Sequence, residues 1–192
     1  MQKLSRKNND IFKIAESFIN LEYLPRTGFA MSKIENAQSV AEHSFGVCLW
    51  ALILMDRMKN IKIDKAKVLT MAIIHETAET ILGDIPYPAR MIIDKPVISQ
   101  AERKTVSNLF NSFPNWKSDW EEFEASDTLE SKIVRAADKL EMMHRVLCYE
   151  KTGKILSEEF WNTSANFYNG ELPEAKKLYD EIVKKHNELM KK

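Results

Sequence analysis

VLTMAIIHETAETILGDIP, residues 68–86, decides how this chain is organised. Its apolar first part, residues 68–74, is typical of a buried helix and leads directly into His75 and Glu76. Residues three or four apart share a helix face, so Glu79 is expected beside both. Burying carboxylates is costly unless a positive group pairs with them, and a divalent metal is one such group. The alternative is an exposed last turn whose charges point into solvent.

The composition favours one helical, globular domain. A chain of 192 residues can bury a sizeable core, and 44% hydrophobic with 29% charged residues is typical of a soluble protein. Only 5 Gly and 6 Pro favour helices over a turn-rich β fold. A net charge of 0 gives no field that would attract nucleic acid or an anionic membrane. The longest apolar run, residues 45–55, is too short to span a bilayer.

Two further features predict a cytoplasmic location. Cys48 and Cys148 lie in apolar helical patterns without metal-type spacing, which is typical of reduced core cysteines. The first seven residues lack the apolar core of a signal peptide.

Apolar periodicity and end signals predict about seven or eight helices and no strand. The expected helices cover residues 9–24, 39–60, 65–82, 97–124 with a break at 113–114, 128–151, 157–168, and a last helix that begins at Leu172-Pro173. A loop is expected from residue 26 to about 38. The fold class is therefore all-α, as a single domain over residues 1–192. The part that would carry a metal site lies in about residues 10–150, and C-terminal helices occupy residues 155–192.

Capping residues support these boundaries. Ser39 and Glu42 form a capping box at the start of one helix, which gives Glu42 a structural role. Asp64 is an N-cap for the next helix, and Gly83 suits its C-terminal end. Asp127 with Glu130 predicts another N-terminal cap.

Two more polar residues stand in apolar surroundings. His43 follows the capping box, and its neighbours Phe45, Val47, Leu49 and Trp50 are expected in the core. His43 could therefore be a packed core residue or a ligand. Asp138 lies in the apolar stripe of helix 128–151, although aspartate is unfavourable in the middle of a helix. It requires either a metal or a salt bridge to Arg135 or Lys139.

Together these segments offer two imidazoles and two carboxylates: His43, His75, Glu76 and Asp138. A mixed nitrogen and oxygen set suits Mn, Co, Fe, Ni, Mg or Zn with positions open to water. A closed structural zinc site would favour thiolates instead.

The order of these residues resembles the HD-domain metal-dependent phosphohydrolases, and within them the 5′-deoxynucleotidase branch. Five motifs within residues 10–150 carry the resemblance: PRTGF (25–29), SVAEHS (39–44), HETAE (75–79), GDIP (83–86) and ADK (137–139). Each motif alone is unspecific, and their shared order and spacing make the likeness. The resemblance implies an HD-domain helical bundle, a dimeric enzyme and one divalent metal. It also implies release of phosphate from deoxyribonucleoside 5′-monophosphates.

The resemblance also implies roles for single residues. The metal ligands would be His43, His75, Glu76 and Asp138. Glu79 would position or deprotonate the attacking water, and Asp84 would contact the sugar side or assist proton transfer. Arg26 would bind the phosphate, because a guanidinium matches phosphate with paired hydrogen bonds. A metal would lower the pKa of its bound water from about 15.7 toward 7.

This chain departs from the family pattern at two of these positions. The family signature is His-Asp, and here Glu76 follows His75. The aromatic residue after Arg-Thr-Gly is usually Trp, linked to the deoxyribose, and here it is Phe29. The preferred metal and the discrimination between ribose and deoxyribose therefore stay open, as do the base and the physiological substrate.

Other functions were weighed against this one. A triphosphate substrate would need more basic residues than Arg26, Lys33, Arg90 and Lys139, which are the ones near the motifs. A two-metal oxygenase or phosphodiesterase would need histidines other than His144 and His186, which lie away from the motifs. Another phosphate ester remains possible, as does a catalytically silent nucleotide-binding protein. Arg26, Glu79 and Asp84 together argue against the silent protein. We expect a homodimeric enzyme with a nucleoside monophosphate as partner, without nucleic acid or membrane.

Overall fold

The computed structural model describes residues 2–154, 156, 159–163, 166, 168 and 170–191. Within these residues, seven helices have ten or more residues and four have four or five. The single β contact there is an isolated bridge between Pro25 and Ser39. The expected all-α fold is therefore confirmed, with the seven longer helices matching the predicted number. In this part of the chain, no helix is long and apolar enough to cross a membrane.

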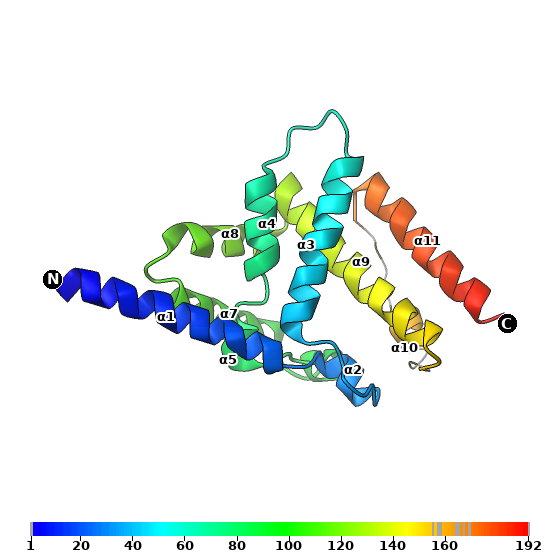
Figure 1. The fold of residues 1–192 in the computed structure, drawn as a ribbon, viewed down its shortest axis with the longest axis horizontal. Helices are drawn as coiled ribbons and strands as arrows, with labels where there is room; N and C mark the ends of the chain where they lie inside the picture. Colours follow the sequence, from blue (N-terminus) through cyan, green and yellow to red (C-terminus); the bar gives the residue numbers. More distant parts are fainter. Residues whose placement is uncertain are drawn as a thin grey trace. The chain divides into compact units, whose positions relative to one another are not determined.

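Figure 1 shows the course of the helices along the chain. The longer ones are α1 (Gln2–Tyr23), α3 (Val40–Arg57), α4 (Lys65–Ile74), α7 (Lys95–Leu109), α8 (Pro114–Ala125), α9 (Leu129–Lys151) and α11 (Pro173–Leu189). The short ones are α2 (Thr27–Met31), α5 (Glu79–Leu82), α6 (Tyr87–Arg90) and α10 (Glu159–Asn162). The expected loop after residue 26 therefore contains α2, and the expected helix 65–82 is interrupted after Ile74. Of the expected helix 157–168, residues 157, 158, 164, 165 and 167 lie outside the described residues, and α10 covers Glu159–Asn162.

Several predicted helix ends are confirmed by hydrogen bonds. Ser39 Oγ accepts from the backbone N–H of Glu42 at 3.1 Å, and Glu42 Oε2 accepts from the N–H of Ser39 at 2.7 Å. Asp64 Oδ1 accepts from the N–H of Lys67 at 3.0 Å. Gly83 ends α5 with φ 76°, a left-handed value that glycine adopts without steric cost. These contacts satisfy backbone groups that a helix end leaves unpaired.

The N-terminal cap of α9 differs from the expected one. Thr128 is the N-cap, and its side chain accepts from the N–H of Ser131 at 3.2 Å. Glu130 instead accepts from the N–H of Asp64 at 3.0 Å. A hydroxyl pair thus replaces the expected Asp127 and Glu130, because either chemistry can satisfy the first turn.

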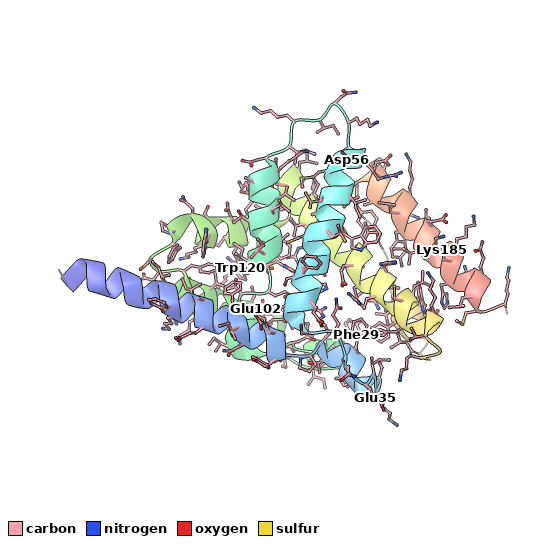
Figure 2. All side chains as sticks on the ribbon, viewed as in Figure 1. Phe29, Glu35, Asp56, Glu102, Trp120 and Lys185 are labelled. Carbon is pink, nitrogen blue, oxygen red and sulfur yellow. The ribbon has the colours of Figure 1, made fainter. Side chains whose placement is uncertain are left out.

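The chain forms two compact units. The first consists of residues 1–42 and 74–121, and the second of residues 43–73 and 122–192. In the first unit α1 packs against α5 and α7. Its core consists of Ile14, Ile74, Ala78, Val106, Leu109, Phe110 and Trp120. The last of these, labelled in Figure 2, is among the largest fully buried side chains.

In the second unit α9 supplies the centre of the core and packs along α11. The predicted stripe on α9 is confirmed, since Ile133, Ala136, Ala137, Leu140, Met143 and Leu147 are all 0% exposed. On α3 the prediction was partly wrong. Val47 is buried, but Phe45 is 74% and Leu49 50% exposed. This helix is apolar on two faces, so hydrophobicity alone could not tell which face is buried.

Candidate active site

A tight turn, residues 75–78, carries His75 and Glu76 in the first unit. α4 ends at Ile74, and the N–H of Thr77 donates to the carbonyl of Ile74 at 3.0 Å. The N–H of Glu79 then donates to Glu76 O at 3.0 Å. These bonds span three residues instead of the four of an α-helix, so the backbone turns more tightly here.

Side chains support this turn. Thr77 Oγ1 donates to the carbonyl of Ile74 at 2.5 Å, and the indole Nε1 of Trp120 donates to His75 O at 3.3 Å. A threonine hydroxyl competes in this way with the regular backbone bonds of a helix. The turn therefore explains why the predicted helix 65–82 was wrong in its middle.

His75, Glu76 and Arg26 come together in this unit. His75 Nε2 lies 3.5 Å from Glu76 Oε1, and Arg26 Nη1 donates to the same oxygen at 2.8 Å. The His75 side chain is 2% exposed and that of Glu76 16%. Glu76 therefore faces His75 while it is paired with an arginine. Its position is therefore compatible both with a metal ligand and with an ion-pair partner of Arg26.

Glu79 is buried, at 7% exposure, near Glu76. Burial, followed by repulsion from the nearby Glu76 carboxylate, raises the pKa of Glu79 from 4.5 to about 10. Arg26 lowers this pKa, and Asp84 raises it further. Within the described residues, Glu79 Oε2 has no hydrogen-bond partner. Glu79 therefore carries a proton at neutral pH as long as no further positive charge joins the cluster.

Asp84 has a contact that the sequence did not reveal. Its Oδ2 accepts from the backbone N–H of Thr27 at 2.5 Å, and its carbonyl accepts from Thr27 Oγ1 at 2.7 Å. Asp84 thereby holds the backbone directly after Arg26. Phe29, labelled in Figure 2, follows on α2 and is 3% exposed. The predicted roles of Asp84 in proton transfer and of both residues in substrate binding stay predictions.

The other two predicted ligands, His43 and Asp138, meet in the second unit. His43 Nε2 lies 3.1 Å from Asp138 Oδ1, and the side chains are 1% and 29% exposed. Arg135, one of the two candidates for a salt bridge to Asp138, pairs with Glu124 at 2.8 Å. An aspartate in the middle of α9 is thus accounted for by a buried imidazole.

The sequence analysis missed Glu141. Its Oε2 lies 2.6 Å from His43 Nδ1, and the side chain is 4% exposed. The available signal was a charged residue directly after Leu140, inside the buried stripe of α9. Both ring nitrogens of His43 therefore face carboxylates, from Asp138 and Glu141.

The donor chemistry of each unit fits a divalent metal. In both units an imidazole Nε2 lies beside a carboxylate oxygen, as His75 with Glu76 and as His43 with Asp138. His43, His75 and Glu76 each offer a ligand atom to a metal. Nitrogen and oxygen donors of this kind suit first-row divalent ions.

Comparison with known proteins identifies residues 19–179 as an HD domain. The 5′-deoxynucleotidase HDDC2 of Xenopus laevis is 31% identical over 174 residues, which cover 87% of this chain and 83% of that protein. The 5′-deoxynucleotidase HDDC2 of Danio rerio is 29% identical over 170 residues, which cover 79% of this chain and 77% of that protein. A conserved hypothetical protein from Pyrococcus furiosus has a similar structure, with a TM-score of 0.79 and 30% identity. The match covers 90% of this chain and 99% of that one.

The raised pKa of Glu79 predicts a pH-dependent cost in the metal-free protein. Between pH 4.5 and 10 folded Glu79 keeps a proton that the unfolded chain has lost, so the free energy of unfolding falls as pH rises. The slope for one such group is at most about 1.4 kcal/mol per pH unit. Glu79→Gln should therefore gain stability relative to wild type, by about 1 kcal/mol or more between pH 5 and 9.

Urea unfolding in the presence of a chelator at pH 5, 7 and 9 measures this difference. Glu16→Gln removes a carboxyl from the exposed side of α1 and serves as the control for the loss of one charge. Parallel pH profiles for wild type and Glu79→Gln would contradict the prediction.

Proposed function

Because this chain belongs to the HD domain family of metal-dependent phosphohydrolases, we propose that it is a metal-dependent 5′-nucleotidase. It releases inorganic phosphate from deoxyribo- or ribonucleoside 5′-monophosphates. The names of the relatives from Xenopus laevis and Danio rerio support this substrate class. The observation that carries the proposal is the contact of Arg26 with Glu76 at 2.8 Å, because a guanidinium, which is suited to bind phosphate, lies there beside a candidate metal ligand.

In this proposal one divalent ion is held by His43, His75, Glu76 and Asp138, and the two units work as one HD domain. The ion would be Mn, Co, Fe, Mg, Ni or Zn. When bound, it supplies a Lewis acid for the phosphoryl oxygens and a water of lowered pKa. The pairing of an imidazole with a carboxylate in each unit supports this ligand set.

The remaining residues act on the substrate and on its protons. The Arg26 guanidinium donates paired hydrogen bonds to the phosphate oxygens. As the water oxygen bonds to phosphorus and the bond from phosphorus to the 5′-oxygen breaks, a Glu79 carboxylate oxygen takes the proton of the water, and the leaving 5′-oxygen takes up a proton. Any positive charge added to the cluster lowers the pKa of Glu79, so that this carboxyl is ionised and can accept the proton. Asp84 keeps the loop of Arg26 in place through Thr27 and faces the sugar side. Phe29 lies beside the deoxyribose, where a buried ring limits the space for a 2′-hydroxyl.

We further propose that two copies of the chain form a dimer in the cytoplasm. Phe45, Leu49 and Leu52 form an exposed apolar stripe on α3, at 74%, 50% and 45% exposure. Large apolar side chains at this spacing suit a helix face that a second copy covers. Both cysteines are free, as is usual in a reducing compartment.

The proposed dimer can be tested by substituting one residue of this stripe with a charged one. Leu49→Glu should convert a dimer into a monomer in light scattering. Ile61→Glu, a similarly exposed position on the loop after α3, is the control. A wild-type protein that is monomeric at all concentrations would contradict the dimer.

A phosphate-release screen tests the proposed function. All deoxyribo- and ribonucleoside 5′-monophosphates are incubated with several divalent metals. Chelator-treated protein should be inactive and should recover with Mn²⁺ or Co²⁺. Glu79→Ala should lower the rate of phosphate release about 10²–10⁴-fold, and this loss would also exclude a contaminating phosphatase.

Full activity after verified metal removal would contradict the proposal. Release only from triphosphates or other esters would favour a different HD phosphohydrolase, and binding without release a silent nucleotide-binding protein.

The role of Glu76 can be separated from its ion pair. Glu76→Gln keeps the side-chain size but removes the charge, so the affinity for Mn²⁺ should fall. Losing a residue that only hydrogen-bonds to a metal ligand costs about 10–100-fold in metal affinity, and losing a ligand should cost at least as much. Glu102→Gln is a matched control, since the Glu102 side chain is also 16% exposed and also pairs with an arginine, Arg90. Calorimetric titration with Mn²⁺ measures both. An unchanged affinity in Glu76→Gln would remove Glu76 from the ligand set.

A further inference from the structure

Glu141 is a buried carboxylate in the apolar stripe of α9. Its side chain is 4% exposed, and its Oε2 lies 2.6 Å from His43 Nδ1. Its other oxygen, Oε1, lies 3.4 Å from Nε and Nη2 of Arg145, which is a long contact. Burying a carboxylate is costly unless a close partner compensates it, so the short contact with His43 is the main one.

This contact determines which nitrogen of His43 carries the hydrogen. A carboxylate accepts hydrogen bonds and cannot donate them, so Nδ1 carries the hydrogen and donates it to Glu141. The other nitrogen, Nε2, faces Asp138 Oδ1 at 3.1 Å, and a neutral ring that keeps its hydrogen on Nδ1 offers the electron pair of Nε2 to a metal. Glu141 thus favours the tautomer that can bind a metal through Nε2.

Gly46 shows that α3 makes room for this contact. A Cβ at Gly46 would lie 2.6 Å from Glu141 Cγ and 2.8 Å from Oε1, which is closer than real contacts allow. Glycine inside a helix is less favourable than alanine. Gly46 lies one turn after His43, so α3 has a less favourable helix residue at the point where the Glu141 side chain packs against it.

We propose that Glu141 is a positioning residue of the metal site. It fixes the tautomer and the ring orientation of His43, so that Nε2 is presented beside Asp138. The inference rests on the proposed function for the identity of the ligand. The His43 tautomer itself is independent of it. An ion pair that only stabilised the fold would not make Mn²⁺ binding depend on Glu141.

A second pair on α9 provides a matched control. Glu150 Oε2 lies 2.9 Å from His186 Nδ1, and the Glu150 side chain is 5% exposed. The His186 ring is stacked on Trp161 at 3.9 Å, and Trp161 Nε1 donates to Glu150 Oε1 at 2.6 Å. Here a carboxylate on the same helix holds an imidazole that is not among the predicted ligands. Removing Glu150 removes the same kind of contact without touching His43.

The test combines metal binding with the tautomer of the ring. In the metal-free protein, long-range ¹H–¹⁵N spectra of His43 should show the hydrogen on Nδ1. Glu141→Ala should shift the hydrogen toward Nε2 and weaken Mn²⁺ binding about 10–100-fold. Glu141→Gln, whose carbonyl can still accept from Nδ1, should restore part of both. Glu150→Ala should leave the Mn²⁺ affinity and the His43 signals unchanged.

Gly46→Ala tests the same idea without altering any polar residue. Its Cβ should displace the Glu141 carboxylate and weaken Mn²⁺ binding, although alanine favours the helix. Wild-type tautomer and affinity in folded Glu141→Ala would overturn the proposal. If Glu141→Ala does not fold, wild-type tautomer and affinity in folded Gly46→Ala overturn it. A wild-type protein that binds no Mn²⁺ would contradict the metal-dependent function instead, and the tautomer would still decide the role of Glu141.

Discussion

Carboxylates with almost no access to solvent are the constraint on which both units depend. An ionised carboxylate that loses its water must be paired or must take up a proton. Glu141 follows the first course, since His43 lies 2.6 Å from its Oε2. Glu79 follows the second, since burial and the neighbouring Glu76 raise its pKa to about 10. Each unit thus keeps a buried acid, by different means.

Much of the fold could be predicted because its signals are local. Pro25 excludes helix at the residue before it, Ser39 and Glu42 cap one helix, and Gly83 ends another with φ 76°. The stripe of α9 has one apolar face, so its periodicity identifies the buried side. On α3 the apolar residues cover two faces. The exposure of Phe45 and Leu49 was therefore not accessible from periodicity.

The candidate site was predicted less completely because its details depend on distant residues. The turn at residues 75–78 is supported by Trp120, which lies 45 residues later in the chain and whose indole N–H donates to the His75 carbonyl. Glu141 depends on His43 and on the space left by Gly46, 98 and 95 positions earlier in the chain. Its sequence neighbours suggest only a charge at the edge of an apolar stripe. Motifs therefore supplied the candidate metal ligands, while the residues packed around these candidates, such as Glu141, needed the structure.

Glu76 is the position where this chain differs most consequentially from the His-Asp pattern. Its extra methylene lets the carboxylate reach about 1.5 Å farther than that of aspartate. In this structure the Glu76 Oε1 atom contacts two partners, His75 Nε2 at 3.5 Å and Arg26 Nη1 at 2.8 Å. An arginine stays charged at any physiological pH, so it needs such a partner when it is only 17% exposed.

Arg26 can change partners without rearranging its loop, because its backbone is held separately from its side chain. The N–H of Arg26 donates to Gln38 O at 2.7 Å, and the next N–H, of Thr27, donates to Asp84 Oδ2 at 2.5 Å. Only the guanidinium depends on Glu76. In the proposed reaction a phosphate would take over hydrogen bonds that Glu76 now accepts, while the loop stays anchored. A pre-positioned loop with an exchangeable side-chain partner loses little entropy when substrate binds. On this view Asp84 serves substrate binding chiefly through the backbone that it holds.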